Sequence, residues 1–227
     1  MRVSVIIPTL DEAERIGALI AALKLQDFEE IVVADGGSQD ATVERATAAG
    51  AVVISASRGR GHQLGAGARA ASGDILFFVH ADSVPPPGAR RRTEASLEAS
   101  GVSAGCFRLR FDGVHPLLGL YAFMSRINHG LFTYGDQGLF LLRSTYLRIG
   151  GYRDMPLFED VDILQRLRRA GRIVKLSDAM VTSARRFLRD GVARRELLSA
   201  GLVALYHLGV SPQRLERWYR PEKQNRE

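Results

Sequence analysis

The chain has 227 residues, of which 46% are hydrophobic and 25% are charged, and its formal net charge is +6. This composition excludes disordered and fibrous proteins and fits one globular α/β domain with a large core. No apolar run reaches the length of a membrane span, and the run before Pro8 is too short for a signal peptide. The single cysteine, Cys106, excludes an intramolecular disulfide, so we expect a cytoplasmic protein.

Strands and helices alternate through the first half of the chain. Apolar and capping patterns predict strands at 3–7, 31–34, 52–55 and 74–79, and helices at 12–24, 40–49 and 61–71. Strands separated by helices of this length imply a parallel sheet with right-handed crossovers. The first half is therefore predicted to be Rossmann-like, a class that does not by itself indicate a chemistry.

The second half of the chain is less regular. Its pattern predicts strands at 103–111, 138–143, 173–176 and 180–183, and helices at 117–132 and 159–170. A helical tail is predicted from 192 to 219, interrupted at Gly209 and Pro212. The predicted class is α/β, with a mostly parallel central sheet flanked by helices and a helical C-terminal tail.

The predicted strand at 74–79 ends in two side chains that can bind a metal. His80 and Asp82 are two residues apart, so they project from the same face just beyond the strand. An imidazole and a carboxylate on one face suit a hard divalent cation such as Mn2+ or Mg2+. Taken alone, the stretch fits a metal site and an ordinary polar turn equally well.

Polar loops follow all four strands of the first half. They occupy residues 8–12, 35–40, 58–63 and 80–82. The carboxyl ends of parallel strands share one edge of a sheet, where ligands bind. Asp35 can accept from a ribose hydroxyl or a base N–H, Gly36 permits close approach of a ligand, and Arg60 can meet a phosphate. The loops together predict a site for a nucleoside diphosphate.

Two motifs of the first half resemble family 2 glycosyltransferases with the GT-A fold. Ile6-Ile7-Pro8-Thr9-Leu10-Asp11-Glu12 is similar to the family's opening motif, with Asp11 where Asn is more usual. Ala34-Asp35-Gly36-Gly37-Ser38-Gln39-Asp40 is similar to its second motif, with Gly36 in place of a second acid. The resemblance implies that Asp35 contacts the nucleoside of the donor.

Two further motifs extend the resemblance from Val3 to about Arg186. His80-Ala81-Asp82 stands where the family carries Asp-x-Asp, and Asp82 matches the acid that holds the cation. Phe158-Glu159-Asp160 matches a Glu-Asp motif whose second acid is the base in inverting members. The His-Ala-Asp variant is similar to a small subgroup, some of whose members are named for arsenosugar biosynthesis or for association with radical-SAM genes.

The resemblance implies a metal-dependent, inverting transfer of a sugar from a nucleotide-diphosphate sugar to an acceptor hydroxyl. It implies a GT-A domain at 1–190, with a donor half at about 1–100 and an acceptor half at about 101–190, and a tail at 191–227 packed on it. The expected base is Asp160, and the expected metal ligands are Asp82 and His80. The expected donor-site residues are Pro8, Thr9, Glu12, Asp35, Gly36, Arg60, Gln63 and Ala81. The residues expected at the acceptor or the diphosphate are Asp136, Gln137, Glu159, Arg185 and Arg186.

The tail and the acceptor leave alternatives open. Leucines such as Leu197 and Leu208 line one helical face beside Arg194, which suits the domain's own core, a second subunit or the inner face of a membrane. The acceptor is a small molecule or a lipid-linked one.

Two rival functions also stay open. A non-catalytic nucleotide-sugar-binding protein is one, and a sugar-phosphate nucleotidyltransferase is the other, although residues 8–12 are acidic and lack glycine. The spacing after Gly59 does not match a dinucleotide-binding fingerprint. Net positive charge is the only feature that suggests nucleic acid, so we expect no nucleic-acid partner.

Overall fold

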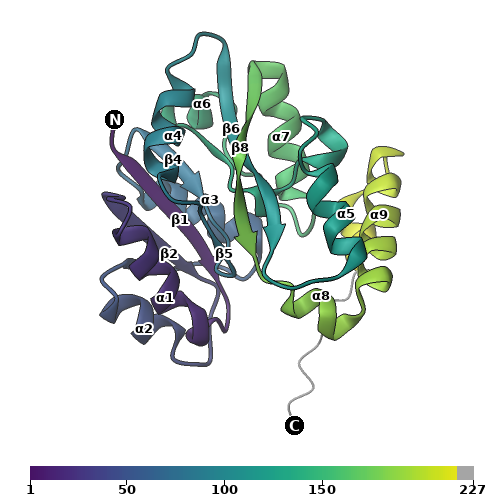
Figure 1. Ribbon diagram of the computed structural model, residues 1–227, viewed down its shortest axis with the longest axis horizontal. Helices are drawn as coiled ribbons and strands as arrows, with labels where there is room; N and C mark the ends of the chain where they lie inside the picture. The colour runs from purple at the N-terminus through teal and green to yellow at the C-terminus, as the bar shows by residue number, and fades with distance from the viewer. Residues whose placement is uncertain (219–227) are drawn as a thin grey trace.

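The computed structural model describes residues 1–218, apart from the side chains of Leu131 and Glu196. Figure 1 shows a curled central sheet with helices packed along it, and α5, α8 and α9 gathered at one side. Within the described chain, none of the helices combines the length and apolarity that crossing a bilayer requires.

The first half follows the predicted alternation of strands and helices. It contains β1 (Val3–Thr9), α1 (Ala13–Lys24), β2 (Glu30–Asp35), α2 (Thr42–Ala48), β3 (Val52–Ser55), α3 (Arg60–Ala70) and β4 (Ile75–Phe78). β2 and β4 both pair with β1 in parallel, and β3 pairs with β2 in parallel. The carboxyl ends of these strands therefore lie at one edge of the sheet, as the sequence predicted.

The second half adds strands of both directions to this sheet. It contains β5 (Ser83–Val84), α4 (Ala89–Leu97), β6 (Val102–Phe111), α5 (Pro116–Met124), η1 (Gly130–Phe132), η2 (Gly135–Gln137), β7 (Phe140–Leu142), α6 (Arg143–Arg148), α7 (Glu159–Ala170), β8 (Arg172–Thr182), α8 (Arg185–Asp190), α9 (Val192–His207) and α10 (Pro212–Glu216). The strand order is β3-β2-β1-β4-β7-β6-β8-β5. Four of the seven neighbouring pairs are parallel, and the pairs β4–β7, β6–β7 and β5–β8 are antiparallel.

The position of β5 curls the sheet. β5 follows β4 closely in the chain, yet it pairs with β8 at the other end of the strand order. The short loop from His80 to Asp82 must therefore bridge from the middle of the sheet to its far edge. This curvature brings residues of the second half over the carboxyl ends of β1 and β4.

Both faces of β1 are buried, which explains its continuous apolar run. Val5 and Ile7 pack in a core cluster with α1, while Ile6 packs on the opposite face with α3 and α7. Full burial of such a side chain stabilises the fold by about 1.5–3 kcal/mol. α3 lies especially close to the sheet, because a Cβ at Gly67 would sit only 2.4 Å from Ile6 Cγ2.

The helix predicted over 117–132 is wrong in its second half. α5 ends at Met124, and its last turns are held by Ser125 Oγ, which accepts from Leu109 N at 2.9 Å. Lys175 Nζ then donates to the carbonyl oxygens of Ser125, Ile127 and Phe132 at 2.7–3.2 Å. A lysine from β8 thus satisfies backbone groups that a continued helix would have satisfied itself.

The two strands predicted at 173–176 and 180–183 form one strand, β8. It pairs with β6 in parallel throughout, and the register shifts where Cys106 and Arg108 face Lys175 and Ala179. Residues between Lys175 and Ala179 form this bulge, so their polar character interrupts the pattern without ending the strand.

Five short elements were not predicted, and some predicted boundaries moved. β5, α4, η2, α6 and α8 are absent from the sequence prediction, and the strand predicted at 138–143 is confined to Phe140–Leu142. The predicted tail divides into α9 and α10 around Gly209, and its predicted end at Tyr219 lies outside the described residues. α4 was missed because it contains the charged run Arg90-Arg91-Arg92 and has only three buried positions, which give a weak amphipathic pattern.

Candidate active site

Asp35 lies at the carboxyl end of β2 with its carboxylate held in place. Its Oδ2 accepts from Gly37 N and Ser38 N, both at 2.9 Å, and its Oδ1 accepts from Ser38 Oγ and from Thr9 Oγ1 at 3.3 Å. Asp35 is buried, and the turn after it needs Gly37 at φ +90°. The carboxylate is therefore oriented before any ligand arrives.

The Gln63 side chain lies beneath the same edge of the sheet. Its Nε2 donates to Thr9 O at 2.7 Å and to Ala34 O at 2.9 Å, so it ties the ends of β1 and β2 together. A Cβ at Gly36 would lie 3.0 Å from the Gln63 amide, which explains glycine in the second motif. Both amide hydrogens of Gln63 are used on the backbone, so the side chain supports this edge of the sheet from below.

Glu12 meets the arginines that follow β8. It is 5% exposed, and its Oε1 pairs with Arg186 Nη2. Arg185 Nη1 pairs with Glu14 Oε2 at 3.4 Å, and Arg185 Nη2 lies 4.0 Å from Glu12 Oε2. Burial raises the pKa of Glu12, and Arg186 opposes that rise. Residues 174 positions apart thus close one side of the site.

His80, Ala81 and Asp82 form the loop after β4. Burial lowers the pKa of His80 to about 4, reinforced by the positive charge of Arg60, so the imidazole is neutral at pH 7. Asp82 O accepts from Ser183 N at 3.0 Å, which joins this loop to the end of β8. Ser83 Oγ lies 3.4 Å from Asp82 Oδ1.

Asp160 reaches the site from the N-terminus of α7. Its Oδ2 accepts from Gly135 N at 3.0 Å, and its Oδ1 accepts from Val161 N at 2.8 Å. A Cβ placed at Gly135 would lie 3.4 Å from His80 Nε2 and 3.5 Å from Asp160 Oδ2. The histidine of the first half and the aspartate of the second half therefore border the same small space.

Glu159 does not point into that space with Asp160. It is 6% exposed, and its Oε1 lies 3.7 Å from Arg60 Nε. Burial raises the pKa of Glu159, and Arg60 opposes the rise. α3 and α7 approach closely here, because a Cβ at Gly61 would lie 3.4 Å from Glu159 Cβ. Glu159 is suited to orient Arg60, which is half-exposed and able to meet an anion.

Asp136 and Gln137 have different environments although they are neighbours. Tyr121 OH donates to Asp136 Oδ2 at 3.1 Å, and Asp136 Oδ1 is buried without a hydrogen-bond partner among the described residues. Burial raises the pKa of Asp136 to about 7, and the charges of Asp160 and Asp82 add to that rise. Gln137 is fully buried, with its Nε2 donating to Phe132 O at 2.8 Å, so its side chain belongs to the core.

The site contains more negative charge than its arginines neutralise. Burial raises the pKa values of Glu12 and Asp136, and the negative charge of Asp82 adds to both rises. A divalent cation beside Asp82 would offset this negative charge, and a neutral His80 has a free lone pair for it. The described residues hold no cluster of three or more His, Cys, Asp or Glu side chains arranged around a metal. A cation here would need oxygen ligands from a bound diphosphate to complete its shell.

The structure brings together most of the residues that the sequence singled out. Pro8 and Ala81 are buried in the walls of the site, and Gln137 and Glu159 support it from behind. The sequence analysis missed Tyr121, which orients Asp136, and Tyr206, whose ring stacks on Phe158 at 4.7 Å. Neither has a local signal, because each partner lies in a different element.

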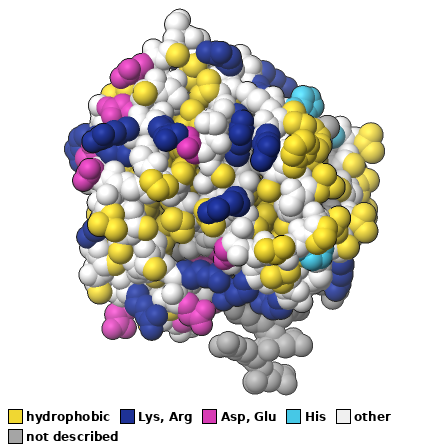
Figure 2. Space-filling view, viewed as in Figure 1, with side chains coloured by type: hydrophobic (Ala, Val, Ile, Leu, Met, Phe, Trp, Pro, Cys, Tyr) yellow, Lys and Arg dark blue, Asp and Glu magenta, His cyan; other side chains and the backbone are white. Residues whose placement is uncertain are grey.

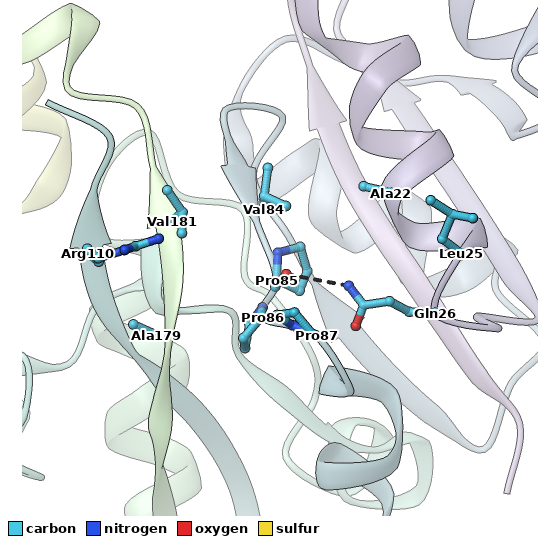
Figure 3. A pocket seen from close by; sticks show the side chains of 10 residues that line it. All are labelled: Ala22, Leu25, Gln26, Val84, Pro85, Pro86, Pro87, Arg110, Ala179 and Val181. Atoms are coloured by element: carbon cyan, nitrogen blue, oxygen red, sulfur yellow. Dashed lines mark hydrogen bonds between the residues drawn. The ribbon is translucent and has the colours of Figure 1, made fainter.

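A separate groove of about 710 Å³ lies on another part of the surface. Figure 3 shows it between α1, the prolines after β5, and the strands β6 and β8. Gln26 Nε2 donates to Pro85 O across it at 3.4 Å. Its lining contains none of the predicted site residues, so the candidate site is assigned from the carboxyl edge of the sheet.

Comparison with known proteins identifies relatives of this chain. Glucosyl-3-phosphoglycerate synthase of Mycolicibacterium paratuberculosis is 38% identical over 96 residues, which are 37% of this chain and 29% of that protein. The corresponding protein of Mycolicibacterium smegmatis is 38% identical over 98 residues, or 32% of its length. The match thus spans about a third of the length of these relatives.

Solved structures share the fold across most of the chain. Glucosyl-3-phosphoglycerate synthase from Mycobacterium tuberculosis, in complex with Mn2+, UDP and phosphoglyceric acid, has a TM-score of 0.59 at 22% identity, covering 80% of this chain and 70% of that one. A mannosyltransferase from Pyrobaculum calidifontis, in complex with GDP-Man and Mn2+, has a TM-score of 0.63 at 22% identity, covering 80% and 56%.

These likenesses confirm the predicted fold class, a mixed α/β sheet of the GT-A type. The family model described as glycosyl transferase family 2 matches residues 4–147, which is more than half of the chain and includes the first three motifs. With that match and this architecture, the chain belongs to the family 2 glycosyltransferases.

Proposed function

We propose that this protein transfers a sugar from a nucleotide-diphosphate sugar to an acceptor hydroxyl, with inversion and with Asp160 as the base. The observation that carries the proposal is the meeting of Asp160 and His80 around Gly135. His80 belongs to the proposed metal and diphosphate side, and Asp160 belongs to the proposed acceptor side. The reacting carbon would lie near these two side chains.

The donor is proposed to lie along the carboxyl ends of β1, β2 and β4. The oriented carboxylate of Asp35 can accept hydrogen bonds from the nucleoside, while Thr9 and Gly36 form the adjoining wall. Arg60 can reach the diphosphate because it is half-exposed and steered by Glu159. The related structures hold UDP or GDP-Man, which supports a nucleoside-diphosphate donor.

Mn2+ or Mg2+ is the proposed cofactor, held by Asp82 and His80. The carboxylates gathered around Asp82 fit such a cation, and related structures contain Mn2+ or Mg2+. When bound, the cation would neutralise the negative charge of the departing diphosphate. Arg186 is proposed to assist, since its guanidinium already borders the site on Glu12.

The transfer itself needs only the chain's own carboxylate as a base. The acceptor hydroxyl would give its proton to Asp160. At the same time the oxygen of that hydroxyl would bond to the anomeric carbon, and the bond between this carbon and the diphosphate would break. The hydrogen bonds from Gly135 N and Val161 N hold the Asp160 carboxylate in place for this role. General-base catalysis of this kind contributes about 100- to 10,000-fold.

The acceptor is proposed to enter from the side of Asp136 and α5. The related Mycobacterium tuberculosis structure contains phosphoglyceric acid, a small acidic molecule, and a lipid-linked hydroxyl is the alternative. A cytoplasmic setting is proposed because the only cysteine, Cys106, is buried and free. Family membership leaves the nucleotidyltransferase alternative without support.

Thermal unfolding with a panel of nucleotides, each with Mn2+, Mg2+ or EDTA, tests the donor site. We expect one nucleoside diphosphate to raise the melting temperature in the presence of metal only, and Asp82→Ala to abolish the rise. Glu98→Gln, an exposed acid at the end of α4, is the matched control and should behave like the unmodified protein. Binding without turnover of any donor would favour the non-catalytic alternative, and no shift with any nucleotide would refute the donor site.

A further inference from the structure

The outer sides of α5 and α9 together form an exposed apolar surface. Ten of the sixteen large hydrophobic residues that are exposed in the described chain lie within 114–127 and 188–218. We call the α5–α9 face the part defined by Val114, Leu117, Leu120, Phe123, Leu197 and Leu208, which are 37–100% exposed. Figure 2 shows hydrophobic side chains gathered on the flank where Figure 1 places α5 and α9.

The inner sides of these helices are already packed. Leu118 on α5 is 1% exposed and Leu202 on α9 is 5% exposed. A surface helix of a globular protein usually turns a polar face to water, but α5 contains no charged residue at all. The exposed side chains are therefore additional to those that the core requires, and a contiguous apolar surface of this kind marks an interaction site.

The charge around the face is positive. Residues 113–129 contain no Asp or Glu, and residues 191–210 contain only Glu196. Arg126 follows α5, with its guanidinium 5.5 Å from the centre of the Phe123 ring, and Arg194 is exposed on α9. Neither arginine forms an ion pair with any residue that the structure describes. The face thus combines apolar side chains with uncompensated positive charge.

We infer that the α5–α9 face docks the protein on an anionic lipid surface. A bilayer offers hydrocarbon to the leucines and phenylalanine and anionic headgroups to Arg126 and Arg194. A second copy of this chain fits less well, because a two-fold contact would bring the same arginines of both copies together. This docking is independent of the proposed transfer, since it requires no turnover.

The same two helices contact the candidate active site from the inside. Tyr121 on α5 donates to Asp136, and Tyr206 on α9 stacks on Phe158, directly before Glu159 and Asp160. Docking would therefore hold the acceptor side of the site near the bilayer, where a lipid-linked hydroxyl is available. This last consequence rests on the proposed function.

Co-sedimentation with vesicles tests the docking. The protein should bind vesicles of phosphatidylcholine mixed with phosphatidylglycerol, and should not bind vesicles of phosphatidylcholine alone. Phe123→Glu and Leu197→Glu should abolish binding, whereas Leu25→Glu, directly after α1, should not, although Leu25 is 86% exposed. Arg126→Gln and Arg194→Gln should each weaken binding about fivefold, the factor expected for one cation near an anionic surface. Arg91→Gln on α4 is the matched control, because Arg91 is also exposed.

Three results would overturn the inference. They are absence of binding to the anionic vesicles, equal loss of binding in face and control variants, and a dimer in light scattering that Leu197→Glu converts to a monomer. The arginine variants change only exposed side chains, so they stay informative if a glutamate variant fails to fold. Nucleotide-dependent thermal shift, measured without vesicles, separates failure of the docking from failure of the proposed function.

Discussion

The carboxylate of Asp160 faces the candidate site and is held in one orientation. Its two oxygens are each held by a backbone N–H, one from Gly135 and one from Val161. Asn at this position would keep a carbonyl oxygen for one of these bonds but could not accept a proton from an acceptor. The substitution therefore removes the proposed base and one of these hydrogen bonds while it keeps the size of the side chain.

Asp160→Asn should lower kcat by about 100- to 10,000-fold, because the proposed base is removed. The metal-dependent thermal shift with the donor nucleotide should be unchanged, since the donor-side residues are intact. Steady-state kinetics and thermal unfolding measure the two effects on one preparation. A variant that retains most of the kcat of the unmodified protein would exclude Asp160 as the base.

Asp136 should make stability depend on pH. Its pKa is about 7 in the folded protein and near the ordinary value of 3.8 when unfolded. Between these two pKa values the carboxyl is protonated in the folded protein and ionised in the unfolded chain. The free energy of unfolding should therefore fall as pH rises from about 4 to 7, and it should level off above pH 7. The total loss should be on the order of 4 kcal/mol, at 1.36 kcal/mol for each pKa unit.

Asp136→Asn should remove that slope and stabilise the protein at pH 8 relative to the unmodified chain. Denaturant unfolding at about pH 5 and pH 8 measures the difference. Glu12 and Glu159 also have raised pKa values, so only the change between variant and unmodified protein reports on Asp136. Identical slopes in the two proteins would contradict the expected ionisation.

At the scale of elements, α3 is positioned by its glycines. Gly67 lies against β1 so closely that a Cβ would overlap Ile6 Cγ2. The same helix begins at Arg60 and carries Gln63 in its first turn, so its distance from the sheet determines where both side chains lie. Close packing of α3 is thus part of how the proposed donor site is formed.

Gly67→Ala should destabilise the protein by about 1–3 kcal/mol, because the added methyl group forces α3 away from β1. Gly17→Ala in α1 is the control, since a Cβ there would meet nothing within 4 Å. That control should be neutral or stabilising by up to about 1 kcal/mol, as expected for alanine within a helix. Denaturant unfolding compares the two, and equal effects would show that the close approach is relaxed in solution.

Other elements show where local pattern stops being informative. The predicted ends of α1 and β2 were nearly correct, because periodicity and capping are local properties. The helix predicted to 132 failed because Lys175, more than forty residues away, takes the carbonyls that end it. The strand predicted as two pieces is continuous because β6 pairs along its whole length.

At the scale of the whole molecule, the tail is connected to the proposed base. The Tyr206 ring stacks on the Phe158 ring with an angle of 23° between their planes. Phe158 has a φ of +65°, a left-handed conformation that a bulky residue rarely adopts. α9 therefore supports a strained residue that immediately precedes Glu159 and Asp160.

Tyr206→Ala should lower kcat by up to about a hundredfold, the loss expected from displacing a catalytic group by about an ångström. The KM for the donor should change little, because the donor contacts lie on other elements. Tyr206→Phe keeps the ring and should restore kcat. Kinetics on both variants would refute the link if the alanine variant had normal kcat, or if phenylalanine did not rescue it.

The sequence by itself determined the Rossmann-like first half and the edge at which its polar loops meet, and it singled out Asp35, Asp82 and Asp160 as candidate site acids. These follow from alternation, spacing and motif, which are properties of neighbouring residues. Only the tertiary structure decided that Gln63 and Glu159 support the site from behind, that Arg186 meets Glu12 and that Tyr206 meets Phe158. It also decided which apolar side chains of α5 and α9 stay exposed. Such contacts join residues far apart in the chain, and they form only when the sheet curls and the halves close over each other.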